Sequence, residues 1–198
     1  MNPSRYLNKL TAVQKDRRTT LGLMLRPHLL EMPLAIQRHD DPFLPFSKAV
    51  INVTRDLVCA YVFDLASYLA IGAAGAVALE RSIAYARADM QTVTILHAPF
   101  ATGDFATATG DTALAVDAVT LTPDADPSPY LTIELGVYVA SQAARAAGGW
   151  FDPVVGHMQI ENIGGALKID LIPSQVVNAH RREDFEEALR QAVQTFDR

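Results

Sequence analysis

Hydrophobic runs alternate with longer amphipathic stretches through the first two thirds of the chain. Four runs are short, almost continuously apolar and bounded by polar or proline-containing segments: residues 20–25, 60–64, 92–96 and 118–122. Such runs are typical of strands that are buried on both faces. Between them, residues 47–58 and 67–87 place apolar side chains at helical spacing. The alternation predicts an α/β protein with parallel strands joined by crossover helices.

Weaker signals continue the pattern on both sides of this region. We expect an amphipathic helix at the N-terminus, a short helix at residues 112–116 and a final helix at 181–196. Three further strands are predicted at residues 131–140, 153–159 and 166–172. A (β/α)8-type TIM barrel, complete or truncated, would average about 25 residues per unit over the 198 residues. The prediction is therefore one barrel domain over residues 1–198, with about seven recognisable strands.

The composition of the chain argues against a disordered, nucleic-acid-binding or membrane protein and favours a cytoplasmic one. Hydrophobic residues make up 49% and charged residues 20% of the chain, which excludes intrinsic disorder over most of it. The net charge is −5 and no basic cluster stands out, so nucleic acid is not an expected partner. Residues 65–79 are shorter than the ~20 residues of a membrane span, and no membrane partner is expected. Cys59, the single cysteine, is expected to be a small buried hydrophobe, and it fits a reducing, cytoplasmic compartment.

Five segments carry a resemblance to a known family. They are MLRPHLLEMP at 24–33, the stretch 56–87, TVTILHAPFATGD at 92–104, DAVTLTPD at 117–124, and 172–192. In this order they resemble the bacterial, long-form type of orotidine 5′-phosphate decarboxylase. The resemblance covers residues 18–126 well, 166–196 moderately and 127–165 poorly. It implies a TIM barrel, a homodimer with active sites at the carboxyl ends of the strands, and uridine-nucleotide chemistry, and we expect no cofactor.

The family's catalytic positions are altered in this chain. The family uses alternating Asp and Lys, in which a Lys protonates the carbon that carbon dioxide leaves. The first-strand Asp corresponds to Arg26 and the second-strand Lys to Val62, whereas the third-strand Asp and Lys correspond to His97 and Pro99. Only Asp104 matches the family's last acid. A valine cannot donate a proton, so we expect that the decarboxylase activity has been lost.

The phosphate-binding Arg of the family corresponds to Ser174 or Gln175, so the expected guanidinium is missing as well. The resemblance and the strand-end positions together give a set of candidates for the barrel mouth: Arg26, Asp64, His97, Asp104, Thr122, Asp124, Asp126, His157 and Gln175. His97, His157 and an Asp could suit a metal, but no tight spacing motif supports one, and we predict none. Arg26 with His97 could hold an anion, and an Arg26–Asp64 ion pair, which we favour, explains the same residues.

Three functions remain open. The first is a non-catalytic relative with a binding, regulatory or structural role, which takes a small anionic or nucleotide ligand and pairs with a second copy or a paralogue. Phe63, Phe100 and Phe105 lie at or near strand ends and would supply that contact. The second is an enzyme of different chemistry with His97 and Asp104 as acid and base. The third is a residual orotidine 5′-phosphate decarboxylase of pyrimidine biosynthesis.

Overall fold

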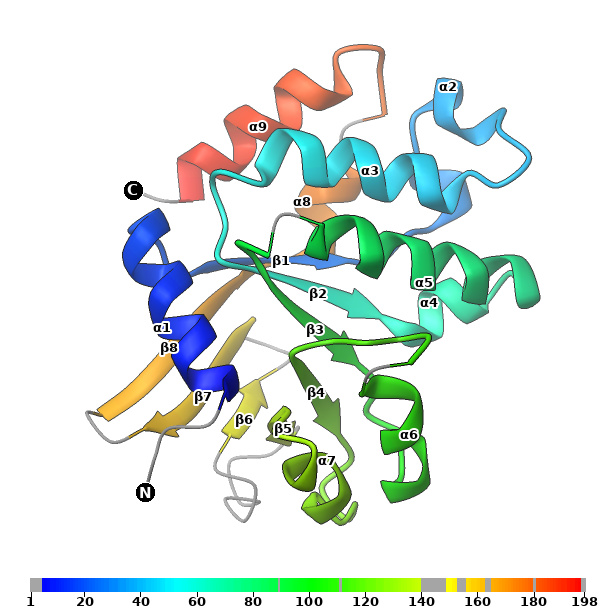
Figure 1. Cartoon of the computed structure of the whole chain (residues 1–198). Coiled ribbons are helices and arrows are strands. Elements are labelled where there is room, and N and C mark those ends of the chain that lie inside the picture. The colour runs from blue at the N-terminus through cyan, green and yellow to red at the C-terminus, as the bar shows by residue number, and fades with distance from the viewer. Residues whose placement is uncertain are drawn as a thin grey trace.

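Eight strands close into one barrel in chain order (Figure 1). The computed structural model describes residues 5–88, 90–110, 112–139, 149–152, 156–162, 165–179 and 181–196. The strands are β1 (Leu21–Leu25), β2 (Ala60–Asp64), β3 (Val93–His97), β4 (Ala118–Leu121), β5 (Gly136–Val139), β6 (Gly149–Asp152), β7 (His157–Asn162) and β8 (Gly165–Ile172).

Helices cover the outside of β1 to β4 and the N-terminal end of the barrel. They are α1 (Arg5–Arg17), α2 (Leu34–Gln37), α3 (Phe43–Thr54), α4 (Leu65–Leu69), α5 (Ala73–Arg87), α6 (Ala106–Thr109), α7 (Ser128–Thr132), α8 (Ser174–Asn178) and α9 (Phe185–Phe196), with short 3₁₀ turns η1 (Leu29–Glu31) and η2 (Gly103–Phe105). None of the described helices has the length and hydrophobicity that crossing a bilayer would require.

The first half of the barrel confirms the predicted parallel arrangement. β1 pairs with β2, β2 with β3 and β3 with β4, each in parallel register. β8 closes the barrel against β1, also in parallel. The expected α/β barrel class is therefore confirmed, and the four apolar runs are its adjacent strands.

The second half departs from the prediction. β7 pairs antiparallel with both β6 and β8, so β6, β7 and β8 form a meander. Of the strand predicted at 153–159, residues 153–155 lie outside the described residues, whereas 157–159 belong to β7, which continues to Asn162. The described barrel has eight strands rather than about seven. Within β7, Met158 and Ile160 are buried in the barrel interior, whereas His157 and Gln159 are partly exposed. This alternation is typical of an antiparallel strand and is harder to recognise than a continuous apolar run.

Two helix predictions and one strand prediction also need correction. The helix expected at 67–87 is divided into α4 and α5, because Gly72 adopts a φ of 71° between them. Gly75 then packs directly on the carbonyl of Tyr68, where a β-carbon would overlap the backbone. The helix expected at 112–116 is instead α6, several residues earlier, and the first part of the strand expected at 131–140 belongs to α7.

Two hydrophobic layers stabilise the barrel. The interior layer includes Val62 and Ile95, and α1 closes its N-terminal end by inserting Tyr6 and Leu10. The hydroxyl groups of Tyr6 and Tyr138 lie 2.7 Å apart inside this layer. Cys59 is fully buried there, as expected, and burial raises the pKa of its thiol to about 12.

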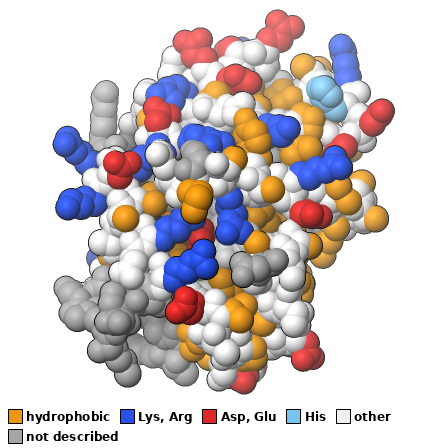
Figure 2. Space-filling model, in the orientation of Figure 1, with side chains coloured by type: hydrophobic (Ala, Val, Ile, Leu, Met, Phe, Trp, Pro, Cys, Tyr) orange, Lys and Arg blue, Asp and Glu red, His pale blue; other side chains and the backbone are white. Residues whose placement is uncertain are grey.

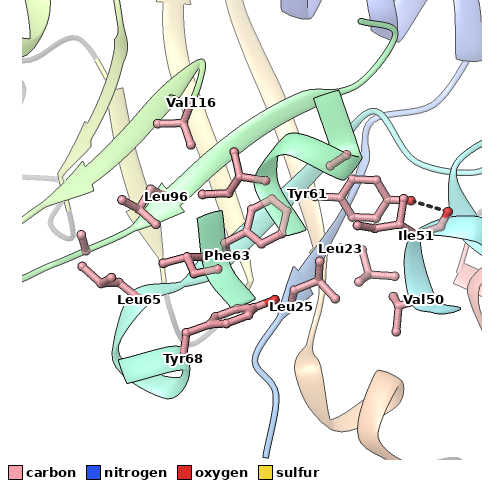
Figure 3. Packing of buried hydrophobic residues seen from close by; sticks show 14 of the residues in the cluster. Leu23, Leu25, Val50, Ile51, Tyr61, Phe63, Leu65, Tyr68, Leu96 and Val116 are labelled. Carbon is pink, nitrogen blue, oxygen red and sulfur yellow. Dashed lines mark hydrogen bonds between the residues drawn. The ribbon is translucent and has the colours of Figure 1, made fainter. Parts of the chain in front are cut away.

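The outer layer lies between the strands and α3, α5 and α9. Figure 3 shows Leu23, Tyr61 and Phe63 on the outward faces of the strands, packed toward side chains from the helices. Phe63 is fully buried and its ring centroid lies 6.4 Å from that of Tyr68. Phe63 therefore belongs to the core and is not exposed at the mouth, which corrects the expectation that it would supply an intermolecular contact.

Candidate functional site

The carboxyl ends of β1, β2 and β3 bring Arg26, Asp64 and His97 together. Asp64 and His97 are register partners at the ends of β2 and β3, and Arg26 follows β1 directly. The three side chains line a pocket of about 260 Å³ at the barrel mouth. Its remaining walls are mostly apolar: Met24, Ala66, Pro99, Phe100 and Phe151.

Arg26 and Asp64 form the expected ion pair. Arg26 Nε lies 2.9 Å from Asp64 Oδ2. The carboxylate is buried, and its Oδ1 accepts a hydrogen bond from Ala66 N at 3.1 Å, which caps the N-terminus of α4. The Arg26 side chain is 59% exposed. Asp64 therefore holds one edge of the guanidinium while the rest of the group faces the pocket and solvent.

His97 is the titratable imidazole of this pocket. Its Nδ1 lies 2.8 Å from Thr120 Oγ1, and its ring meets that of Phe151 edge to face at 5.2 Å. Burial lowers the pKa of His97 below 6.5; the Asp64 carboxylate raises it and the Arg26 guanidinium lowers it. His97 is therefore neutral at pH 7 and suited to accept a proton or a hydrogen bond rather than to act as a cation.

A second pocket of about 400 Å³ adjoins the first. It shares Arg26 and Ala66 with the mouth pocket and is otherwise lined by Pro27, His28, Glu31, Ser67, Ser174, Gln175 and Asn178. Gln175 was predicted as a candidate, and the structure confirms only its position at this pocket. Ser174 is 6% exposed, and its side chain lies in the wall of this pocket. His28 and Asn178 were missed because tertiary packing, not spacing along the chain, places them here.

The acidic candidates after β3 and β4 do not line either pocket. Asp104 is exposed on η2. Burial, together with the negative charge of Asp104, raises the pKa of the Tyr130 phenol to about 12. Asp126 Oδ1 accepts a hydrogen bond from Ser128 N at 2.9 Å at the start of α7. Asp124 is exposed beside it, and the carbonyl of Thr122 accepts a hydrogen bond from the Ala125 amide.

His157 lies on the outer face of the barrel, not at the mouth. The expectation was wrong because Met158 and Ile160 point into the barrel. Side chains alternate along a strand, so His157 points outward. Its Nδ1 lies 2.8 Å from Asp170 Oδ1 on β8, and Asp170 also accepts a hydrogen bond from Thr20. The described residues contain no cluster of His, Cys, Asp and Glu that could hold a metal ion.

Part of the chain is similar in sequence to known proteins. No protein-family model matches the chain. A segment of 79 residues is 38% identical to the orotidine 5′-phosphate decarboxylase of Herpetosiphon aurantiacus, and one of 74 residues is 38% identical to that of Thermomicrobium roseum. These matches cover 40% and 37% of this chain but only 30% and 26% of the two relatives.

The fold comparison extends over the whole chain. A Streptomyces avermitilis protein, solved as a candidate orotidine 5′-phosphate decarboxylase, aligns with all of this chain and 95% of its own, with a TM-score of 0.73 and 17% identity. A candidate orotidine-monophosphate decarboxylase from Toxoplasma gondii aligns with 70% of this chain and 50% of its own, with a TM-score of 0.57 and 23% identity. Part of the chain is therefore similar in sequence to orotidine 5′-phosphate decarboxylases, and the chain as a whole shares the barrel fold of these solved structures.

The described lining of the mouth pocket contains no lysine. Val62, which the sequence resemblance aligns with the second-strand Lys of the decarboxylases, is fully buried in the barrel interior, and Pro99 lines the mouth pocket. The chain contains only four lysines, all in described segments: Lys9 and Lys15 on α1, Lys48 on α3 and Lys168 on β8. Lys9 pairs with Asp117 at 2.7 Å, and Lys48 lies 5.1 Å from the centroid of the Tyr85 ring. No ammonium group of this chain therefore reaches its own mouth pocket.

Proposed function

We propose that this barrel binds a small phosphate-bearing anion of the nucleotide class at its mouth and does not decarboxylate it. The observation that carries the proposal is the mouth itself, where a guanidinium stands between two adjoining pockets and no lysine is present. Binding would retain part of the ancestral ligand chemistry after loss of the proton donor.

Arg26 is the anchor of the proposed site. A guanidinium presents several donors in a planar fork that matches phosphate oxygens, and Asp64 already holds its Nε edge. Ser174 lies in the wall of the second pocket, and its hydroxyl can donate to the same phosphate. The rings of Phe100 and Phe151 line the first pocket and offer apolar surface for a base or sugar.

The decarboxylation step lacks its essential group. It requires a proton donor at the carbon that loses carbon dioxide, and Val62 has nothing to donate. His97 also lines the described pocket, but burial lowers its pKa, so at pH 7 it is a neutral imidazole and not a cationic proton donor. The lowered pKa of His97 favours a second candidate function, in which this neutral imidazole acts as a general base in a different reaction. Asp104, its expected partner, lies outside the pocket lining and gives no support to that pairing.

Self-association through the mouth edge forms part of the proposal. Phe100 is 56% exposed there, whereas Phe105 is only partly buried against the core. Near the carboxyl end of β2, Leu69, Ile71 and Val77 are exposed where α4 meets α5, and Figure 2 shows hydrophobic side chains on the right-hand edge of the molecule in this region. A second copy or a paralogue would cover this surface, and burying one such side chain stabilises by about 1.5–3 kcal/mol before the cost of association. We infer a cytoplasmic, single-domain protein.

Calorimetric titration with uridine and orotidine monophosphates tests the binding proposal. We expect saturable binding of at least one nucleotide and a loss of about tenfold or more in Arg26→Gln, since a charge-assisted hydrogen bond contributes about 1.5–3 kcal/mol. Arg81→Gln, which removes an exposed guanidinium from α5, is the matched control and should bind normally. Binding that Arg26→Gln leaves unchanged would remove the basis for the site.

Release of carbon dioxide from orotidine monophosphate tests the other half of the proposal. The natural protein should release none above background. Val62→Lys alone should not restore the reaction, because Arg26 and Pro99 still replace the other members of the family's array. Turnover by the natural sequence would refute the loss of catalysis.

A further inference from the structure

A third pocket lies apart from the barrel mouth, between α2 and the segment that leads from α8 into α9. Its volume is about 370 Å³, and it shares no lining residue with the two mouth pockets. Three arginines line it: Arg38 directly after α2, and Arg181 and Arg182 before α9. Glu183 is the only acidic residue in the lining. Figure 1 shows α2 and the chain before α9 beside each other at the top of the molecule.

Among the described lining residues of this pocket, three arginines face one acidic residue. Among the described residues, Arg38 and Arg182 form no ion pair. Arg181 donates a hydrogen bond to the carbonyl of Leu30, which fixes its guanidinium without neutralising it. By contrast, Arg190 on α9 is paired with Asp56 at 2.6 Å. Three guanidinium groups around one cavity repel each other. A bound anion with more than one negative charge would attract each of them and so offset that repulsion.

We propose that this pocket binds a small anion with two or more phosphate groups, of the nucleoside diphosphate class. Arginine is suited to this because its planar fork meets two phosphate oxygens at once, and three forks around one cavity match a diphosphate better than a single phosphate. The cavity has the size of a small-molecule site. Pro33 and Leu34 form an apolar wall beside the arginines, and Leu34 is 66% exposed, so a nucleoside attached to the diphosphate has a surface to lie on.

The experiment separates this site from the mouth. The full-length Arg26→Gln protein, in which the proposed mouth anchor is absent, is titrated calorimetrically with inorganic pyrophosphate and with uridine diphosphate. We expect both to bind, and both to weaken as the salt concentration rises. Adding Arg38→Gln and Arg182→Gln should weaken both by about tenfold or more, whereas Arg81→Gln should change neither.

A further variant tests the apolar wall. Leu34→Ser should weaken uridine diphosphate and leave pyrophosphate unchanged, because only the nucleoside would contact that side chain. Three results would overturn the proposal: no binding of either compound at millimolar concentration, equal binding after loss of Arg38 and Arg182, or an equal loss in Arg81→Gln. Every measurement is made on protein that lacks the Arg26 guanidinium. Absence of binding at the arginine pocket would therefore leave the mouth proposal standing, and absence of nucleotide binding at the mouth would leave the arginine pocket standing.

Discussion

Arg26→Met and Asp64→Asn break the same ion pair, yet we expect them to cost different amounts of stability. The reason is the unequal burial of the two partners. The Asp64 carboxylate is 6% exposed and the Arg26 side chain is 59% exposed. Removal of the arginine leaves a buried carboxylate with Ala66 N as its one remaining hydrogen-bond donor. Removal of the carboxylate leaves a guanidinium that water can solvate.

The two costs follow from this geometry. An incompletely satisfied buried acceptor costs about 1–3 kcal/mol, which is our expectation for Arg26→Met. In Asp64→Asn the asparagine oxygen can still cap α4, and asparagine is as good an N-cap as aspartate. Only the half-exposed ion pair is lost, and pairs of that kind contribute about 0.2–1 kcal/mol. The arginine variant should therefore be the less stable of the two by about 1 kcal/mol or more.

Urea denaturation of both variants and of the natural protein at pH 7 measures the difference. The exposed pair Arg190–Asp56 is a matched control, since both of its side chains are more than one third exposed and each single substitution there should cost less than about 1 kcal/mol. If Asp64→Asn loses as much free energy of unfolding as Arg26→Met, or more, the argument from unequal burial is refuted.

Four further outcomes are expected. In an NMR titration, Asp64→Asn should lower the pKa of His97 further and Arg26→Met should raise it, and shifts of the same sign would contradict the assignment. Because that pKa is already lowered, the unfolded chain binds more protons, and the His97 contribution to stability should rise with pH up to about 6.5, a rise absent from His97→Gln. In light scattering, Phe100→Asp should convert a dimer into a monomer of 21.5 kDa, and a natural protein already of that mass would refute the mouth interface. Gly136→Ala should destabilise by about 1–3 kcal/mol in thermal or urea unfolding, since a β-carbon there overlaps the tyrosine ring that α1 inserts.

The sequence predicts the parallel half of the barrel well because burial on both faces leaves a continuous apolar run. Tyr61 and Phe63 point outward under the helices while Val62 points into the barrel, so the positions of β2 before its terminal Asp64 are all hydrophobic. The meander gives no such signal. In β7, Met158 is buried and His157 is partly exposed, and a strand with one polar face is short, alternating and easily merged with the turn beside it.

The same distinction explains which candidate site residues were found. Arg26, Asp64 and His97 were predictable because they end or follow adjacent parallel strands, whose carboxyl ends meet at one edge. His157 was misplaced because its position depends on the direction and facing of β7, which the sequence pattern does not reveal. Asp126 carried a signal of a different kind: an acidic residue two positions before Ser128 is typical of a cap, and the structure shows that hydrogen bond.

The reversed strand also bears on where phosphate chemistry could remain. Phosphate sites of TIM barrels are frequently formed by the loops after the seventh and eighth strands. Because β7 runs antiparallel, its carboxyl end lies away from the mouth, whereas the segment after β8 places in the second pocket Ser174 and Gln175, which the sequence resemblance aligns with the family's phosphate-binding Arg. Among the described residues, the guanidinium that borders both mouth pockets is that of Arg26, directly after β1. Arg26 therefore supplies, beside Ser174 and Gln175, the positive charge that the segment after β8 lacks. For this reason the binding proposal depends on Arg26 and not on the position of the family's phosphate-binding Arg.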